Sequence, residues 1–138
     1  MPRLSTALAC ASWLLVTACN ATSTLPTTTT AATTTATVTD TFTGTLAQGT
    51  SASSTFTVGT AGTVTITLVS LSPQTTITMG VGIGTPSASV CVVNAAQDDV
   101  KVGASIQASL NPGTYCVLLY DLGNMSGPDA YSLTVVHP

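Results

Sequence analysis

The chain has 138 residues, of which 44% are hydrophobic and only 5% are charged, and its formal net charge is −3. Its two cationic side chains, Arg3 and Lys101, do not form the basic footprint that a phosphate backbone requires, so we expect no nucleic acid partner. This length leaves room for one small domain once the N-terminal segments are set aside.

The N-terminal segment predicts export. Arg3 provides a positive start, and residues 4–16 are mostly apolar. An apolar run of about 13 residues is too short to span a bilayer, which needs roughly 20, but it fits the central region of a signal peptide. Val16-Thr17-Ala18 then supplies the small residues of a cleavage site. We therefore predict a signal peptide over residues 1–18.

The next residue is Cys19, and the stretch VTAC over residues 16–19 resembles the lipobox of bacterial lipoproteins. In that family the signal is cut just before the cysteine, whose thiol carries a lipid. The resemblance implies a lipidated Cys19 and a membrane anchor, because two or more acyl chains give stable anchoring. Asn20 replaces the aspartate that signals inner-membrane retention in this family, which favours the outer membrane of a bacterial envelope. The alternative is a plain signal peptide on a secreted or periplasmic protein.

A threonine-rich tract follows the cysteine. It has few large apolar groups and cannot bury enough surface to offset the cost of ordering its backbone. Residues 19–39 are therefore interpreted as the lipidated cysteine and a disordered linker that holds a domain away from the membrane. The alternative is an extra strand, since threonine favours sheets.

From residue 40 to residue 138 the hydrophobic pattern alternates with period two, which is typical of half-buried strands. Turn residues, including Asp98 and Asp99, separate the runs. The pattern predicts an all-β domain, an antiparallel β-sandwich of about eight strands with jelly-roll or immunoglobulin-like Greek-key connections. The expected strands are 40–46, 53–58, 62–71, 75–84, 88–94, 105–110, 114–121 and 130–137.

Two details concern the sandwich itself. The sequence LNPGTYC contains a turn followed by Tyr115, in the spacing of a tyrosine corner, where the hydroxyl bonds back to the backbone. With Cys10 in the signal peptide and Cys19 lipidated, Cys91 and Cys116 remain, and an oxidising compartment predicts a disulfide between them. The alternative is a reactive thiol pair or a metal site, but neither a CxxC spacing nor a nearby histidine supports it.

The segment from residue 40 to residue 138 resembles the bacterial pre-peptidase C-terminal domain, a β-sandwich module of secreted proteins. The resemblance is carried by FTVGTAGTVTITL, LNPGTYCVLLYD and DAYSLTVVHP, in which Tyr131, Leu133 and Val135 match the final strand of the family. It implies a sandwich fold and an extracellular context. The chain departs from the family in its cysteine pair and in lacking a peptidase domain and the acidic loop cluster of calcium-binding relatives.

Groups for chemistry are few. His137 is expected to be an exposed terminal residue, and no G-x-S-x-G or H-E-x-x-H motif is present, so we expect no enzyme. The glycines 80, 82 and 84 share one strand face, which predicts that another part of the chain packs closely on this face. The alternative is that a ligand packs there. Weak candidates for a calcium site are Asp98, Asp99, Asp121 and Asp129. Their alternative role is in turns.

These observations predict a non-enzymatic, lipid-anchored envelope protein whose sandwich serves in binding, adhesion or structural support. The expected partners are the membrane, through the lipid, and an envelope protein or glycan. No cofactor is expected apart from the weak calcium candidates. The alternative is a soluble secreted module that assists an exported hydrolase and binds calcium.

Overall fold

The computed structural model of the chain describes residues 35–138, which form eight strands. The predicted signal peptide, Cys19 and residues 20–34 of the predicted linker lie outside the described residues. Within the described part, no helix is long and apolar enough to cross a bilayer. The strands are β1 (Val38–Leu46), β2 (Ser51–Val58), β3 (Gly62–Ser72), β4 (Met79–Ser87), β5 (Val90–Val100), β6 (Ser105–Leu110), β7 (Gly113–Asp121) and β8 (Asp129–His137).

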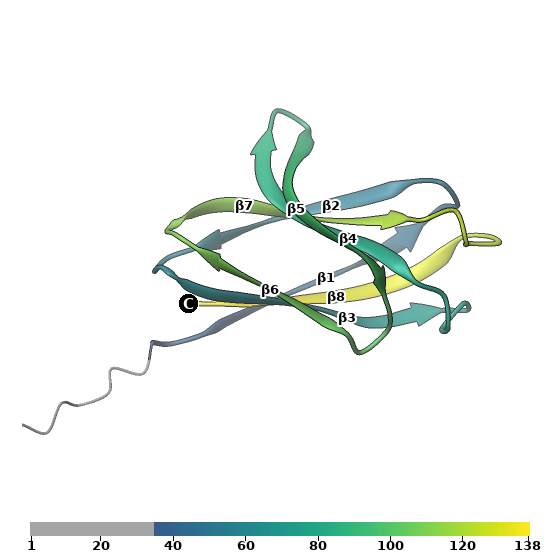
Figure 1. Cartoon of the computed structure of the whole chain (residues 1–138), viewed down its shortest axis with the longest axis horizontal. Helices are drawn as coiled ribbons and strands as arrows, with labels where there is room; N and C mark the ends of the chain where they lie inside the picture. Colours follow the sequence, from purple (N-terminus) through teal and green to yellow (C-terminus); the bar gives the residue numbers. More distant parts are fainter. Residues whose placement is uncertain (1–34) are drawn as a thin grey trace, which may run out of the picture. The chain divides into compact units, whose positions relative to one another are not determined.

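The strands form two four-stranded antiparallel sheets, which confirms the predicted sandwich (Figure 1). One sheet has the order β1-β8-β3-β6 and the other has the order β2-β7-β4-β5. The first strand therefore pairs with the eighth, the second with the seventh, the third with the sixth and the fourth with the fifth. This nested pairing is that of a jelly roll. Of the two predicted kinds of Greek-key connection, jelly-roll and immunoglobulin-like, the structure therefore has the first.

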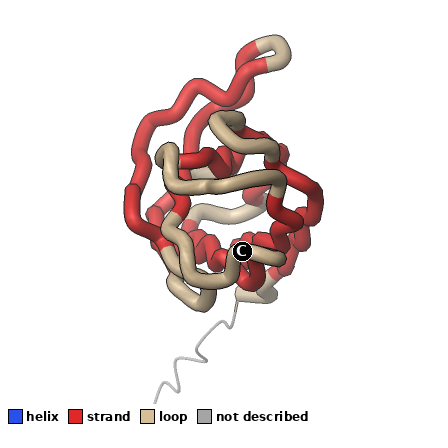
Figure 2. The backbone as a smooth tube through the Cα atoms, turned by 90° about the vertical axis from the view of Figure 1, so that its right-hand side faces the viewer, coloured by secondary structure: helices blue, strands red, loops and turns tan. Residues whose placement is uncertain are grey.

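The core lies between the two sheets, and the view in Figure 2 shows strands on opposite sides with loops closing the near end. Alternate residues of most strands point inward, so the period-two pattern of the sequence becomes one apolar layer, whereas β5 buries only Cys91 and Val100. The buried cluster consists of Leu46, Phe56, Val58, Val64, Ile66, Leu68, Leu71, Met79, Val81, Ile83, Val100, Val117, Leu119, Met125, Leu133 and Val135.

Two predicted strand limits are wrong. Strand β4 begins at Met79 rather than near residue 75, because the backbone N–H of Gln74 donates to the carboxylate of Asp129 and not to a neighbouring strand. Strand β5 continues to Val100 instead of ending near residue 94.

The extension of β5 also removes the predicted turn at Asp98 and Asp99. The strand passes this point through irregularities in its pairing with β4, and Asp99 takes a φ of 62° there. Bulges absorb extra residues in a strand without ending it, and aspartate tolerates this backbone region better than most residues.

The predicted tyrosine corner is confirmed. The hydroxyl of Tyr115 donates to the backbone carbonyl of Asn111 at 3.1 Å and ties the start of β7 to the turn before it. The ring also packs against Phe56, with centroids 6.1 Å apart, so this corner joins the turn to the core.

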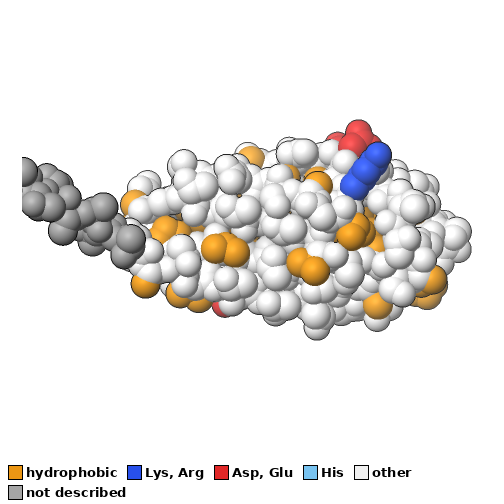
Figure 3. Space-filling view, turned by 90° about the horizontal axis from the view of Figure 1, so that it is seen from below, with side chains coloured by type: hydrophobic (Ala, Val, Ile, Leu, Met, Phe, Trp, Pro, Cys, Tyr) orange, Lys and Arg blue, Asp and Glu red, His pale blue; other side chains and the backbone are white. Residues whose placement is uncertain are grey.

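Most of the surface shown in Figure 3 is uncharged, and hydrophobic side chains are scattered over it. Lys101 is the one Lys or Arg among the described residues, and in Figure 3 the basic side chain lies beside acidic groups near one edge. Three of the exposed valines, Val90, Val92 and Val93, fall in the first half of β5.

Candidate binding groove

The two faces of β4 have different compositions. Met79, Val81 and Ile83 point into the core, whereas the glycines at 80, 82 and 84 point to the outer face of the sheet. These glycines are nevertheless buried, so another part of the chain covers the outer face.

The covering groups come from β7 and β5. The ring of Tyr120 lies over Gly80, a methyl group of Val93 lies over Gly82, and the backbone carbonyl of Val92 lies over Gly84. A Cβ at Gly84 would overlap that carbonyl, so only glycine permits this approach. The prediction that the chain's own residues pack on the glycine face is confirmed, and the alternative of a ligand on that face is not needed to explain the glycines.

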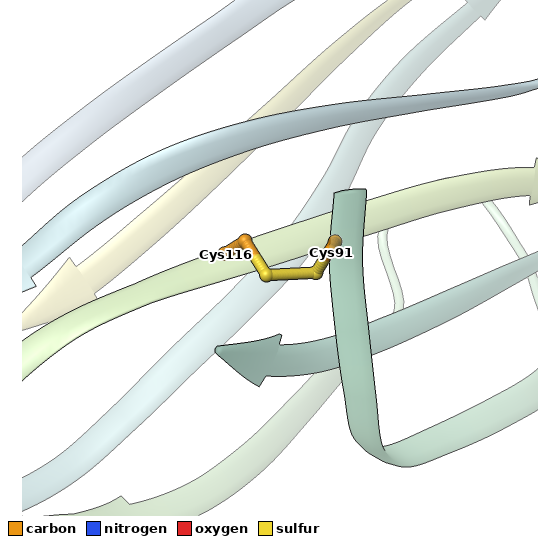
Figure 4. The surroundings of a disulfide bond; sticks show 2 residues. All are labelled: Cys91 and Cys116. Atoms are coloured by element: carbon orange, nitrogen blue, oxygen red, sulfur yellow. A yellow bond between two sulfur atoms is a disulfide. The ribbon is translucent and has the colours of Figure 1, made fainter. Parts of the chain in front are cut away.

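A disulfide holds the start of β5 in this position (Figure 4). Cys91 of β5 and Cys116 of β7 are joined with their Cα atoms 5.8 Å apart, as predicted. Strand β4 separates β5 from β7 in the sheet by two strand spacings, about 9.6 Å, so the shorter distance between the cysteines means that the start of β5 itself crosses over β4 on the outer face to reach β7. Both cysteines are buried, but on the outer face of the sheet and not between the two sheets, since the next residue along β7, Val117, belongs to the cluster between the sheets.

The tip of the β4–β5 hairpin thereby overhangs the outer face of β7 and β2, and Figure 1 shows this hairpin rising from the sheet. Two adjoining hollows of about 190 Å³ and about 310 Å³ lie beneath it and together form what we call the hairpin groove. Among residues 35–138, no charged side chain lines either hollow. The lining includes Ser51, Ser53 and Thr55 of β2, Leu118 of β7, and Ser89 and Val90 of the hairpin.

Sequence reasoning missed this groove. Its walls come from three segments that are distant in sequence, and no short motif marks any of them. The available signal was the combination of a glycine stripe with a cysteine in each of two strands, which together require one strand to cross another.

Tyr120 has a second contact beside the glycine stripe. Its hydroxyl donates to Oδ1 of Asp98 at 2.6 Å. This hydrogen bond, together with partial burial and the negative charge of Asp98, raises the pKa of Tyr120 above 10.0. Asp98, one of the weak calcium candidates, is therefore engaged in fixing the ring that covers Gly80.

Asp121 is occupied by backbone donors. Its Oδ1 accepts from the N–H groups of Gly123, Asn124 and Met125, and its Oδ2 accepts from Gly49 at 2.8 Å. The bond from Gly49 and those from the loop lower the pKa of Asp121. This carboxylate organises the β7–β8 loop and has little capacity left for a cation.

The other two acidic candidates each have a partner for one carboxylate oxygen, while the buried Oδ2 of Asp129 has none among residues 35–138. Asp129 is fully buried, and its Oδ1 accepts from the backbone N–H of Gln74 at 3.0 Å. Asp99 accepts from the hydroxyl of Thr78 at 3.4 Å. Among residues 35–138, the structure brings together no group of three or more acidic, histidine or cysteine side chains that could hold a metal ion. Asp121 therefore has the loop role that was its alternative interpretation, whereas Asp98, Asp99 and Asp129 lie within strands β5 and β8.

The expectation for His137 is wrong, because only 4% of its surface is exposed. Strand β8 continues to this residue with its alternation intact, so the imidazole points inward and packs on Phe56, with ring centroids 5.6 Å apart. Its Nε2 lies 3.1 Å from Oδ2 of Asp40, and its Nδ1 lies 3.2 Å from the carbonyl oxygen of Pro138. Proximity to the C-terminus did not imply exposure, since the last strand pairs with both β1 and β3.

Comparison of the chain with protein-family models and with curated proteins finds no match to either.

Proposed function

We propose that the chain is a non-enzymatic, lipid-anchored binding protein of a bacterial envelope, displayed on a threonine-rich tether. The observation that carries the proposal is the VTAC stretch at residues 16–19, placed between an apolar signal-like segment and a linker. The Cys91–Cys116 disulfide supports it, because such bonds persist in oxidising compartments outside the cytosol.

The arrangement of titratable groups supports a binding role over catalysis. Both ring nitrogens of His137 already have oxygen partners, and the ring is buried. A general base needs a nitrogen within reach of a substrate proton, which this histidine does not offer. The resemblance to the pre-peptidase C-terminal domain is part of the same proposal. The jelly-roll fold is compatible with that family, but it is equally compatible with other families of β-sandwich proteins.

The hairpin groove is the binding surface that the geometry favours. Its larger hollow, about 310 Å³, is at the lower end of the size range of small-ligand sites, and the groove combines hydroxyl groups with apolar Leu118 and Val90. An uncharged lining favours an uncharged segment of an envelope protein or glycan as the ligand.

Metabolic labelling with an alkyne analogue of palmitate tests the anchor. The wild-type chain and a Cys10→Ser variant are expected to incorporate the label and to remain in the membrane fraction. A Cys19→Ser variant is expected to lose both properties. Label that persists in Cys19→Ser would rule against the assignment.

Arrays of envelope proteins and glycans test the groove. A Ser53→Arg variant should fill the hollow with a bulky charged side chain and abolish any binding that the wild type shows. A Thr63→Arg variant adds the same side chain on the exposed face of the other sheet and should bind as the wild type does. Equal binding by all three proteins would place the ligand elsewhere.

A further inference from the structure

The sandwich has four sheet edges, formed by β1, β6, β2 and β5. An unprotected edge offers unpaired backbone groups to another strand, and charges or bulges prevent such pairing. Strand β1 carries Asp40, and β5 is interrupted by register shifts and carries Asp98 and Asp99 just before its last residue. Strand β6, with the sequence SIQASL, has neither charges nor irregular pairing.

The edge of β6 also borders an opening into the core. A hollow of about 110 Å³ lies between β6 and β5, where the two sheets face each other without a joining strand. Isoleucines 66, 83 and 106 line it together with Gln97 and Gln107, and small side chains at Ala95, Ala96 and Ala108 leave it open. A cavity of this size and chemistry has room for an aliphatic side chain.

Strand β2 is uncharged too, but the large side chains that it points inward are already covered. Phe56 and Val58 are 4% and 1% exposed, respectively. Strand β6 instead alternates half-buried Ile106, Ala108 and Leu110 with exposed Ser105, Gln107 and Ser109. An added strand beside β6 would therefore gain both backbone hydrogen bonds and contact with the isoleucines of the hollow.

We propose that the occupant is β6 of a second copy of this chain, paired antiparallel about a two-fold axis through Gln107. In this register Ile106 of each copy lies opposite Ala108 of the other, so a large side chain meets a small one on the core-facing side. Residues directly opposite in an antiparallel pair share a face, with Cβ atoms about 5 Å apart. Because of the two-fold axis, Ile106 of each copy lies next to the hollow of the other copy, so the same contact is made twice, as in any isologous interface.

The neighbouring registers fit less well. Pairing about Ala108 would place alanine opposite alanine and leave the hollow unfilled, while Ile106 would meet Leu110. A parallel arrangement would bring Lys101 of both copies to the same end of the seam, whereas the antiparallel one separates them. The uncharged sequence of β6 thus suits another copy of itself.

Charge placed on the two-fold axis tests the proposal. In sedimentation-velocity runs over a concentration series, the purified full-length chain should shift to twice the mass of one chain. Gln107→Lys and Gln107→Glu should each weaken association at least tenfold, because like charges would then face each other. An equimolar mixture of the two variants should restore the dimer. Thr63→Lys, an exposed position one strand inward, is the matched control and should behave as the wild type does.

Circular dichroism of each variant separates a folding defect from a lost contact, and Gln107 is exposed, so all variants should keep the strand spectrum. A wild-type chain that stays monomeric up to about 1 mM would overturn the proposal. So would a dimer that survives both charged variants, or a mixture that fails to recover, because either result assigns the contact to another surface.

Discussion

The inner and outer faces of β4 show two different ways of burying one strand. On the inner face, Met79, Val81 and Ile83 meet apolar side chains of the opposite sheet. On the outer face, Gly80, Gly82 and Gly84 are covered by neighbouring strands of their own sheet, through a ring, a methyl group and a backbone carbonyl. Burial of the inner face depends on large side chains that fill the core, whereas burial of the outer face depends on residues that have no side chain. The glycines of the outer face also allow β5 to cross closely over β4, and this crossing leaves the hairpin groove beneath the hairpin.

The largest loss of stability is expected on the inner face. Leu119→Ala in β7, which is 2% exposed, should lower the free energy of unfolding by about 3 to 4 kcal/mol, since it removes transfer energy and leaves a cavity. Urea denaturation measures the loss. A loss below about 1 kcal/mol would mean that the space between the sheets is less tightly packed than the structure indicates.

The disulfide is the next contribution in size. Replacing both Cys91 and Cys116 by alanine opens a loop with a sequence separation of 25 and should cost about 3 kcal/mol on the chain-entropy model. Because both sulfurs lie outside the core, near-native strand content should remain. Hydrogen exchange should quicken at residues 86–91, the hairpin tip, more than in β3 or β8. Uniform quickening would show that the bond supports the whole domain and not the groove.

A methyl group at the outer face sharpens the comparison directly. Gly84→Ala should destabilise the protein by about 2 kcal/mol, because the new Cβ would collide with the backbone carbonyl of Val92, which cannot rotate away. Gly59→Ala is the control, since a Cβ at Gly59 meets nothing within 4 Å. Equal stability of the two variants, compared by thermal unfolding, would contradict the close crossing of β5 over β4.

The smallest effect concerns Tyr120. Its raised pKa means that the bond to Asp98 stabilises the fold below the unfolded value near 10.0 and is lost as pH rises through the folded value. Asp98→Asn should move the phenol titration, followed by ultraviolet absorbance, back toward 10.0. Asp99→Asn, which affects the contact with Thr78 instead, should leave the phenol titration where it is. Equal shifts in both variants would argue against the specific bond.

The alternation of apolar residues was sufficient to predict the two-layer sandwich, and the Pro-Gly-Thr-Tyr turn was sufficient to predict the bond from Tyr115 to Asn111. Both signals are local in sequence: the first is a periodicity of apolar residues and the second is the chemistry of a turn. The burial of His137 depends on β1 and β3 flanking β8, which no local pattern reveals.

The groove was missed for the same reason. The two cysteines predicted a covalent link, but not that the start of β5 would cross over β4 to make it. The aspartates at 98 and 99 were read as a turn because their composition is typical of one, while the pairing with β4 carries the strand through them. Long-range strand order, which composition does not encode, decided each case.

Mass spectrometry of the N-terminal peptide from the native protein tests the proposed anchor most directly. We expect a peptide that begins at Cys19 and carries the added mass of a diacylglyceryl group on the sulfur and a fatty acid on the amine. A free thiol at Cys19, or a mature chain that still carries residues 1–18, would contradict the account.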